Sequence, residues 1–209
     1  MSAILVMQVN KKLEFYFDFS SSYGYLATLF VEDLARDIDR ELIWKPYLMG
    51  AAMKITGIPV TLEVPIKRDY VGRDVARYCE HFGVKMKTPD GFPFSSVAAS
   101  RVFYVLTDDQ PSLAADWCKS AAKAAWEAGK NLSDWNIIQE TLLNLDIEPG
   151  QVAARIREAD VKERLRKETD GAIQRGLWGS PHFIIDEHDM YWGCDKRFEI
   201  RNTYSIKKN

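Results

Sequence analysis

The first clear pattern along the chain is an alternation of apolar and polar residues that starts at Leu13. Its apolar positions are Leu13, Phe15, Phe17 and Phe19. A period of two residues predicts a strand whose two faces differ. Beyond a short polar turn, apolar residues recur every four positions, at Leu26, Phe30, Leu34 and Ile38. This second spacing predicts one face of a helix, so a buried strand leads directly into a helix.

The turn between this strand and this helix contains three serines, Ser20, Ser21 and Ser22. The start of a helix has free N–H groups and a positive dipole end, which favour an anion. A serine here either caps the helix, for which one hydroxyl suffices, or holds an anionic ligand such as a thiolate. This stretch alone favours the cap and leaves the second interpretation open.

The next apolar segment, Leu42–Leu48, predicts a strand that ends, or lies at a sheet edge, near Pro46. Strand, helix and strand form a βαβ unit, so the two strands should be parallel neighbours joined by a right-handed crossover. Only helices are expected in the long middle part of the chain. Their ranges are 50–57, 67–82, 97–106, from 109–111 to a stop at Gly129, 133–144 with Ser133 as cap, a short helix from Pro149, and 160–175 with Asp160 as cap.

The last part of the chain predicts an antiparallel hairpin. His182–Ile185 and Met190–Trp192 are expected strands, joined by a polar turn. Asp195 can cap a final helix that runs from Lys196 to about Thr203. A βαβ unit, a helical block and a β-rich closing piece together predict an α/β fold that is interrupted by a helical insertion.

Composition excludes several classes of function. The chain has 209 residues, of which 46% are hydrophobic, and a mean hydropathy of −0.27, which is typical of a soluble globular protein. A net charge of −2 argues against a nucleic-acid partner, because such proteins normally carry a basic field. No apolar run reaches membrane-spanning length, and residues 1–7 lack the basic region of a signal peptide. We therefore expect a cytoplasmic protein without a membrane partner.

The cysteines and histidines give no sign of a disulfide framework or a metal site. An odd number of cysteines without a C-x-x-C motif suits reduced thiols, and these are Cys79, Cys118 and Cys194. The three histidines are scattered and lack the spacing of metal ligands, so no metal is expected. Glycine-rich phosphate loops and the G-x-S-x-G motif are also absent from the sequence.

Four short motifs, taken in order, give the chain a family resemblance. They are FYFDFSSSY at 15–23, GAAMKITG at 50–57, GSP at 179–181 and WGCD at 192–195. With them the chain resembles the 2-hydroxychromene-2-carboxylate isomerases and kappa-class glutathione transferases, relatives of the disulfide oxidoreductase DsbA. The resemblance implies a thioredoxin-like fold, βαβ plus ββα, with a large all-helical insertion between the two halves. The thioredoxin-like domain would comprise 12–49 and 176–209, and the helical insertion 50–175.

Ser21 stands where DsbA-like proteins place the first cysteine of C-x-x-C, and Gly24 where they place the second. Thiol–disulfide exchange requires a thiolate on the protein, so chemistry through that motif is excluded. The resemblance implies instead that the chain binds glutathione and that Ser21 is the catalytic residue. A hydrogen bond from its hydroxyl would stabilise the glutathione thiolate and lower the pKa of the thiol.

The resemblance implies further glutathione contacts at the two later motifs. A cis bond before Pro181 should expose the backbone of Ser180 to the cysteinyl part of glutathione, although any tight turn can use Ser-Pro. The segment that would hold the γ-glutamyl end comprises Trp192, Gly193, Cys194 and Asp195. Asp195 would accept from the γ-glutamyl ammonium, or only cap the last helix. Cys194 is interpreted as a small packing residue.

For the second substrate, the resemblance indicates Lys54, whose charge would hold a substrate carboxylate. A solvated helix lysine explains Lys54 nearly as well. Tyr23 and Phe92 either wall an aromatic substrate or pack in the core. His182 is expected to be a structural histidine whose ring is satisfied inside the protein.

The leading functional hypothesis is a glutathione-dependent cis–trans isomerase of the 2-hydroxychromene-2-carboxylate type, acting on a small aromatic substrate. One alternative is a kappa-like glutathione transferase or peroxidase that acts on small electrophiles. A second alternative is a thioredoxin-fold module that binds a peptide or protein at the Ser180-Pro181 edge without catalysis. The resemblance also suggests a homodimer.

Overall fold

Residues 11–205 are described by a computed structural model, and segment 1–7 lies outside this range. The strands of its sheet are β1 Lys12–Phe17, β2 Glu41–Pro46, β3 His182–Ile185 and β4 Asp189–Trp192. They lie in the order β2-β1-β3-β4. β1 is parallel to β2 and antiparallel to β3, which pairs antiparallel with β4. The predicted βαβ unit and closing hairpin are confirmed, and Pro46 ends an edge strand.

Two short helices replace the single helix that the four-residue spacing predicts after the serines. They are α1 Ser22–Thr28 and α2 Val31–Asp37. The backbone of Phe30, with φ −133° and ψ −10°, leaves helical geometry and separates them. The side chain of Phe30 is nevertheless buried, so the apolar spacing continues across a break that it cannot reveal.

The remaining helices lie largely where the periodicity predicts them. They are α3 Met49–Thr56, the 3₁₀ turn η1 Thr61–Glu63, α4 Pro65–Phe82, α5 Val97–Asp109, α6 Pro111–Trp126, α7 Trp135–Leu143, α8 Pro149–Arg155, α9 Ala159–Gln174 and α10 Arg197–Tyr204. Gly57 and Gly83 end α3 and α4 in the left-handed conformation that glycine adopts at low cost. The helical block between β2 and β3 is thus present as expected.

Two predicted helix caps are wrong. The cap of α7 is Asp134, whose carboxylate accepts the Asn136 N–H at 2.9 Å. Ser133 instead donates its hydroxyl to the side-chain oxygen of Asn131, two residues earlier. Helix α9 starts at Ala159, with Glu158 at the cap position, so the expected cap residue Asp160 lies inside its first turn.

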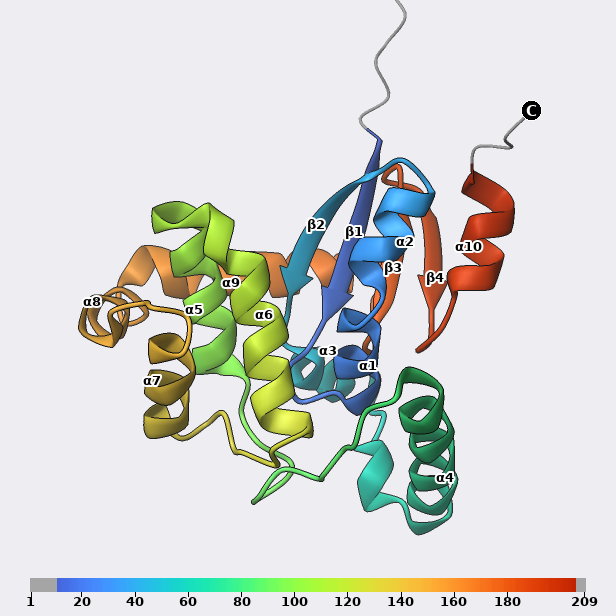
Figure 1. The fold of residues 1–209 in the computed structure, drawn as a ribbon, viewed down its shortest axis with the longest axis horizontal. Helices are drawn as coiled ribbons and strands as arrows, with labels where there is room; N and C mark the ends of the chain where they lie inside the picture. Colours follow the sequence, from blue (N-terminus) through green and yellow to red (C-terminus); the bar gives the residue numbers. More distant parts are fainter. Residues whose placement is uncertain (1–10, 206–209) are drawn as a thin grey trace, which may run out of the picture.

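One continuous core joins the sheet to the helical block. Phe15 on β1 stacks on Phe17 and on Phe183 of β3, with ring centroids 5.0 and 5.5 Å apart. The same cluster of buried side chains includes Trp117 of α6. Helix α4 is different, because none of its residues is buried. Figure 1 shows it in dark green beyond the ends of β1 and β2, apart from helices α5 to α8.

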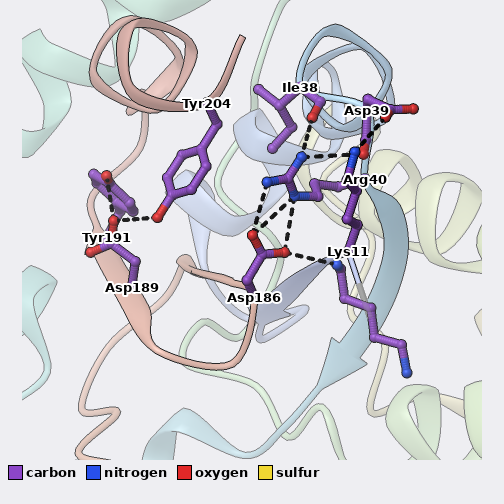
Figure 2. A network of polar contacts seen from close by, with 9 residues as sticks. Lys11, Ile38, Asp39, Arg40, Asp186, Asp189, Tyr191 and Tyr204 are labelled. Atoms are coloured by element: carbon purple, nitrogen blue, oxygen red, sulfur yellow. Dashed lines mark hydrogen bonds and ion pairs between the residues drawn. The ribbon is translucent and has the colours of Figure 1, made fainter. Parts of the chain in front are cut away.

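A network of polar contacts lies at the end of the sheet where β1 begins (Figure 2). Arg40, just before β2, forms an ion pair with Asp186 in the turn between β3 and β4, at 2.8 Å. Asp186 also accepts the N–H of Lys12 at 3.2 Å, where β1 begins. On α10, Tyr204 donates to Asp189 at 2.6 Å. Arg40 and the start of β1 are therefore bonded to the β3–β4 turn at the end of β1 opposite to the serine turn.

Candidate active site

Ser21 is the N-cap of α1, and its hydroxyl makes two hydrogen bonds. It accepts the N–H of Gly24 at 3.0 Å and donates to the carbonyl oxygen of Ser180 at 3.1 Å. Its residue is only 7% exposed, but it borders a cavity. Capping is therefore a real role of Ser21, and the same residue also lines the cavity.

The peptide bond between Ser180 and Pro181 is cis, and it presents the Ser180 backbone to the serine turn. The Ser180 hydroxyl accepts the N–H of Asp18 at 3.0 Å. Gly24 makes this close approach possible. A Cβ atom at Gly24 would lie 2.8 Å from Ser180 Oγ, closer than real Cβ contacts occur, and 3.0 Å from the Asp18 carbonyl oxygen, which is also tight.

The Asp18 carboxylate holds the serine turn in place, a role that the alternation of the strand does not predict. Its side chain is buried, with Oδ1 accepting both the N–H and the hydroxyl of Ser20 at 2.8 Å. Its Oδ2 accepts the N–H of Met49 at 2.8 Å, at the start of α3. One carboxylate therefore joins the starts of two helices that line the same cavity. The Asp-x-Ser spacing, typical of an Asx turn, is the signal that could have indicated it.

The cavity beside Ser21 has a volume of about 270 Å³ and is largely apolar. Its polar lining consists of Ser20, Ser21, Ser22, Tyr23, Thr61 and Ser180. The rest of the wall, apart from Gly179, comes from aliphatic, methionine and aromatic side chains, namely Met49, Met53, Ile58, Val60, Leu62, Val71, Phe92, Trp126, Trp178 and Trp192. No charged side chain lines it among the described residues, so the cavity suits an apolar ligand body held by a few hydroxyl groups.

The structure brings together only some of the site residues expected from the sequence. Ser21, Ser180 and Trp192 line one cavity, as do Tyr23 and Phe92. The other expected residues do not line it, and these are Pro181, Gly193, Cys194, Asp195 and Lys54. Lys54 is exposed in the last turn of α3, and its contact with a second substrate stays a prediction.

Asp195 is already paired within the chain. Its Oδ2 lies 2.5 Å from Arg197 Nη2, and its Oδ1 accepts from Arg197 Nε at 2.8 Å and from the Arg197 N–H at 3.1 Å. Burial opposes the charge of Asp195, but the bonds from Arg197 outweigh burial and lower the pKa of the carboxyl. Asp195 thus bonds the start of α10, as the capping interpretation expects, while Lys196 holds the formal cap position.

The thiol of Cys194 is not poised for reaction. Burial, with the neighbouring Asp195 and Asp74 charges, raises its pKa well above the usual value. Because the thiolate is the reactive form, this environment suits a packing residue. Cys194 is also buried in the main hydrophobic cluster, and its contact with glutathione stays a prediction.

His182 is buried at the start of β3. Its Nδ1 lies 2.9 Å from the carbonyl oxygen of Gly179, so this nitrogen carries the proton. Burial lowers the pKa of the ring to about 4, and the histidine is neutral at physiological pH. Its Nε2 is buried without a partner among the described residues. A structural role for His182 therefore holds, although the ring is only half satisfied.

Two tryptophans at one side of the cavity include one that sequence reasoning missed. Trp178 packs against Trp192 with ring centroids 4.1 Å apart, and they are 37% and 47% exposed. Gly179 permits this pairing, because a Cβ there would lie 2.8 Å from Trp192 Nε1. Exposed indole rings beside Ser180 offer a flat apolar surface to a ligand.

Two further classes of site can be addressed directly. Within residues 11–205, no cluster of His, Cys, Asp and Glu side chains is arranged to hold a metal ion. None of the helices in the described part of the chain combines the length and the apolar character needed to cross a membrane.

Comparison with known proteins identifies the family. A 2-hydroxychromene-2-carboxylate isomerase of Sphingobium xenophagum is 26% identical over 200 residues, covering 95% of this chain and 100% of that protein. Glutathione S-transferase kappa 2 of Caenorhabditis elegans is 24% identical over 196 residues, covering 87% and 84%. A solved structure of a 2-hydroxychromene-2-carboxylate isomerase has a TM-score of 0.82 at 22% identity, covering 91% of this chain and 93% of that one. The model of the DsbA-like thioredoxin domain matches residues 12–205, so the chain belongs to this family.

Proposed function

We propose that the protein is a glutathione-dependent enzyme whose leading reaction is cis–trans isomerisation of a 2-hydroxychromene-2-carboxylate-like substrate. One observation carries the proposal. Ser21, whose hydroxyl bonds the Ser180 carbonyl, lines an apolar cavity next to the cis bond at Ser180-Pro181, and neither Ser21 nor Gly24 is a cysteine. The site can therefore bind a thiol but cannot exchange disulfides through this motif. The name of the kappa-class relative supports glutathione as that thiol.

The hydroxyl of Ser21 has one proton, which it now donates to Ser180. A thiolate in the cavity would attract this proton by rotation of the hydroxyl, while the bond accepted from Gly24 remains. The Ser180 carbonyl would then be free to accept the cysteinyl N–H of glutathione. A hydrogen bond to a charged group contributes about 1.5–3 kcal/mol, which corresponds to a thiol pKa lower by roughly one to two units. Helix α1 has only seven residues, so the hydroxyl rather than the helix dipole supports the argument.

The proposed reaction forms and breaks one C–S bond. The thiolate adds to a conjugated carbon, and the electron pair of the double bond moves to the substrate carbonyl, giving an enolate. The former double bond rotates as a single bond. The enolate then re-forms its carbonyl and expels the thiolate, so that the alkene is inverted and glutathione is regenerated. Atoms and electrons balance without a redox partner.

A transferase of the kappa type is the second candidate, and one observation favours it. A carboxylate substrate normally meets a positive charge, yet no lysine or arginine lines the cavity beside Ser21 among the residues described. A neutral electrophile would fit this lining directly. An aryl-halide conjugation assay run beside an isomerisation assay distinguishes the two reactions.

Titration calorimetry with glutathione tests the proposal at its first step. We expect wild type to bind glutathione and the bound thiol to show a lowered pKa in its thiolate absorbance. Ser21→Ala should raise that pKa, whereas Ser22→Ala, which alters a second hydroxyl of the same wall, should not. Absence of binding at millimolar glutathione would instead favour the binding module without catalysis.

The family resemblance also underlies two proposals about the whole protein. We expect a homodimer, which light scattering after size-exclusion chromatography checks, and a cytoplasmic location, which cell fractionation checks. Neither proposal is needed for the chemistry at Ser21.

A further inference from the structure

A second cavity continues the one beside Ser21. It has a volume of about 400 Å³ and lies between α4, the end of α6 and the segment that precedes α5. Both cavities share five wall residues, Ser22, Leu62, Val71, Phe92 and Trp126. They therefore form one cleft, which we divide into an inner part at Ser21, Ser180 and Trp192 and an outer part beyond the shared wall. Ser22 lies at the boundary, beside the residue that would hold the sulfur.

The outer part differs from the inner part in charge. Arg68 of α4 and Lys87 line it, and no carboxylate does among the described residues. Both side chains are exposed, and neither takes part in the ion pairs found within residues 11–205. Two other cations of this region are already paired, Arg77 with Asp74 and Lys130 with Glu140. Arg68 and Lys87 thus remain available to an anionic ligand.

Lys87 is held in place by its surroundings. Its N–H donates to the carbonyl oxygen of Trp126 at 2.7 Å, which fixes the backbone at the end of α6. Its side-chain stem lies over Gly129, where a Cβ would be 2.6 Å from Lys87 Cδ. The stem therefore has a packed base, while its charged end is exposed at the cleft.

We propose that Arg68 and Lys87 form an anion-binding subsite, and that the second substrate joins an apolar, aromatic body to an anionic group. The body would lie along Phe92 and Trp126, with its reactive carbon toward Ser21 and its anion toward the two cations. This inference rests on the proposed function, since it assigns the outer cleft to the substrate and the inner part to glutathione. It also supplies the positive charge that the inner cavity lacks and that Lys54 does not provide.

Two matched fluorescent probes test the subsite without requiring turnover. 8-Anilinonaphthalene-1-sulfonate has an aromatic body with one negative charge, and N-phenyl-1-naphthylamine has the same body without charge. The test variant is Arg68→Glu with Lys87→Glu. The control is Arg73→Glu with Lys85→Glu, which makes the same change of net charge on the same two segments but on residues that line neither cavity.

We expect the test variant to raise the Kd of the anionic probe roughly fivefold to twentyfold, as for loss of two exposed ion pairs and gain of two repulsions. The Kd of the neutral probe and the Kd of glutathione should stay within about twofold of the wild-type values. In the control variant, the Kd of the anionic probe should also stay within about twofold of wild type. Salt should weaken the binding of the anionic probe to wild type more than its binding to the test variant. Val71→Trp, which fills the shared wall from a helix without buried residues, should weaken both probes.

Distinct results would overturn the inference. If the test variant lost affinity equally for the two probes, the anionic group would not be what the subsite recognises. If the test and control variants lost equal affinity for the anionic probe, Arg68 and Lys87 would not form the subsite. Loss of glutathione affinity in the test variant would assign the cations to a glutathione carboxylate instead. If Val71→Trp left the Kd of both probes unchanged, the probes would not bind along the shared wall. Wild type that fails to bind glutathione would contradict the proposed function alone, because the probe measurements do not depend on it.

Discussion

Ser21 and Ser180, 159 residues apart in the chain, meet through one hydrogen bond of 3.1 Å from the Ser21 hydroxyl to the Ser180 carbonyl. This bond connects the start of α1 to the turn that contains the cis bond. It keeps the hydroxyl oriented while the cavity holds no thiol. A ligand that replaces it must offer Ser21 a better acceptor and Ser180 a donor, and the cysteinyl part of glutathione has both groups.

Replacement of Ser21 by alanine tests the catalytic role that we propose for it. We expect the fold to persist with a loss of about 1 kcal/mol from the missing cap. The value of kcat/KM with glutathione should fall roughly tenfold to a hundredfold, since a bond to a charged group is lost. Steady-state kinetics on purified variants measure this, with Ser22→Ala as the matched control. An unchanged kcat/KM in Ser21→Ala would remove Ser21 from the chemistry.

Replacement of Gly24 by alanine tests the close approach of α1 to the cis turn. The new Cβ would press on Ser180 Oγ and the Asp18 carbonyl, so the free energy of unfolding should fall by about 1–3 kcal/mol. Urea unfolding followed by circular dichroism measures it. Gly171→Ala is the control, because a Cβ at Gly171 on α9 meets nothing within 4 Å. Removal of a helical glycine there should raise stability by roughly 0.5–1 kcal/mol.

Replacement of Asp18 by asparagine tests the carboxylate that joins α1 to α3. Asparagine offers one acceptor oxygen in place of two, so it cannot serve Ser20 and Met49 together. We expect a loss of about 1–3 kcal/mol in the free energy of unfolding, with weaker glutathione binding. Asp33→Asn, an exposed site on α2, should change stability by less than about 0.5 kcal/mol. Equal effects of the two substitutions would contradict the role of Asp18.

His182 predicts a pH dependence of stability. Its pKa is about 4 when folded, against 6.5 for the free side chain. Above pH 6.5 both states are neutral, so this histidine makes no difference. As the pH falls from 6.5 towards 4, the unfolded chain takes up a proton that the folded protein resists, and stability is lost.

The expected loss over this window is roughly 2–3 kcal/mol. Urea unfolding at pH 7 and pH 4.5 measures it in wild type and in His182→Gln. The variant should be less stable at pH 7 but should lose less between the two pH values, whereas His188→Gln, at an exposed position, should behave as wild type. Identical pH slopes for wild type and His182→Gln would show that His182 is not the group involved.

Much of the fold is readable from local periodicity, because the apolar faces of β1, β3 and most helices are set by burial. The break at Phe30 is not, since the buried spacing runs through it. The caps at Asp134 and Glu158 lie one position after and two positions before the predicted ones, respectively. Asp134 accepts the N–H of Asn136, whereas Glu158 makes no side-chain cap bond. Such choices depend on geometry that a sequence pattern does not contain.

Residues of the site can be predicted from the sequence only where they belong to one of the four motifs. Ser21, Ser180 and Trp192 lie in recognisable motifs and meet at one cavity. Trp178 and Val71 lie outside the motifs, and only the tertiary fold places them in the wall. The pairing of Asp195 with Arg197 and the exposed position of Lys54 also depend on side-chain directions that spacing does not fix.

Helix α4 supplies part of the cleft wall through Val71 and Arg68, yet none of its 18 residues is buried. Substitutions on such a surface usually change stability by less than about 0.5 kcal/mol. Residues of α4 that line the cleft can therefore change with little effect on the stability of the Ser21 turn or the cis turn. During evolution, the cleft wall that α4 supplies can thus vary while the Ser21 turn and the cis turn stay the same.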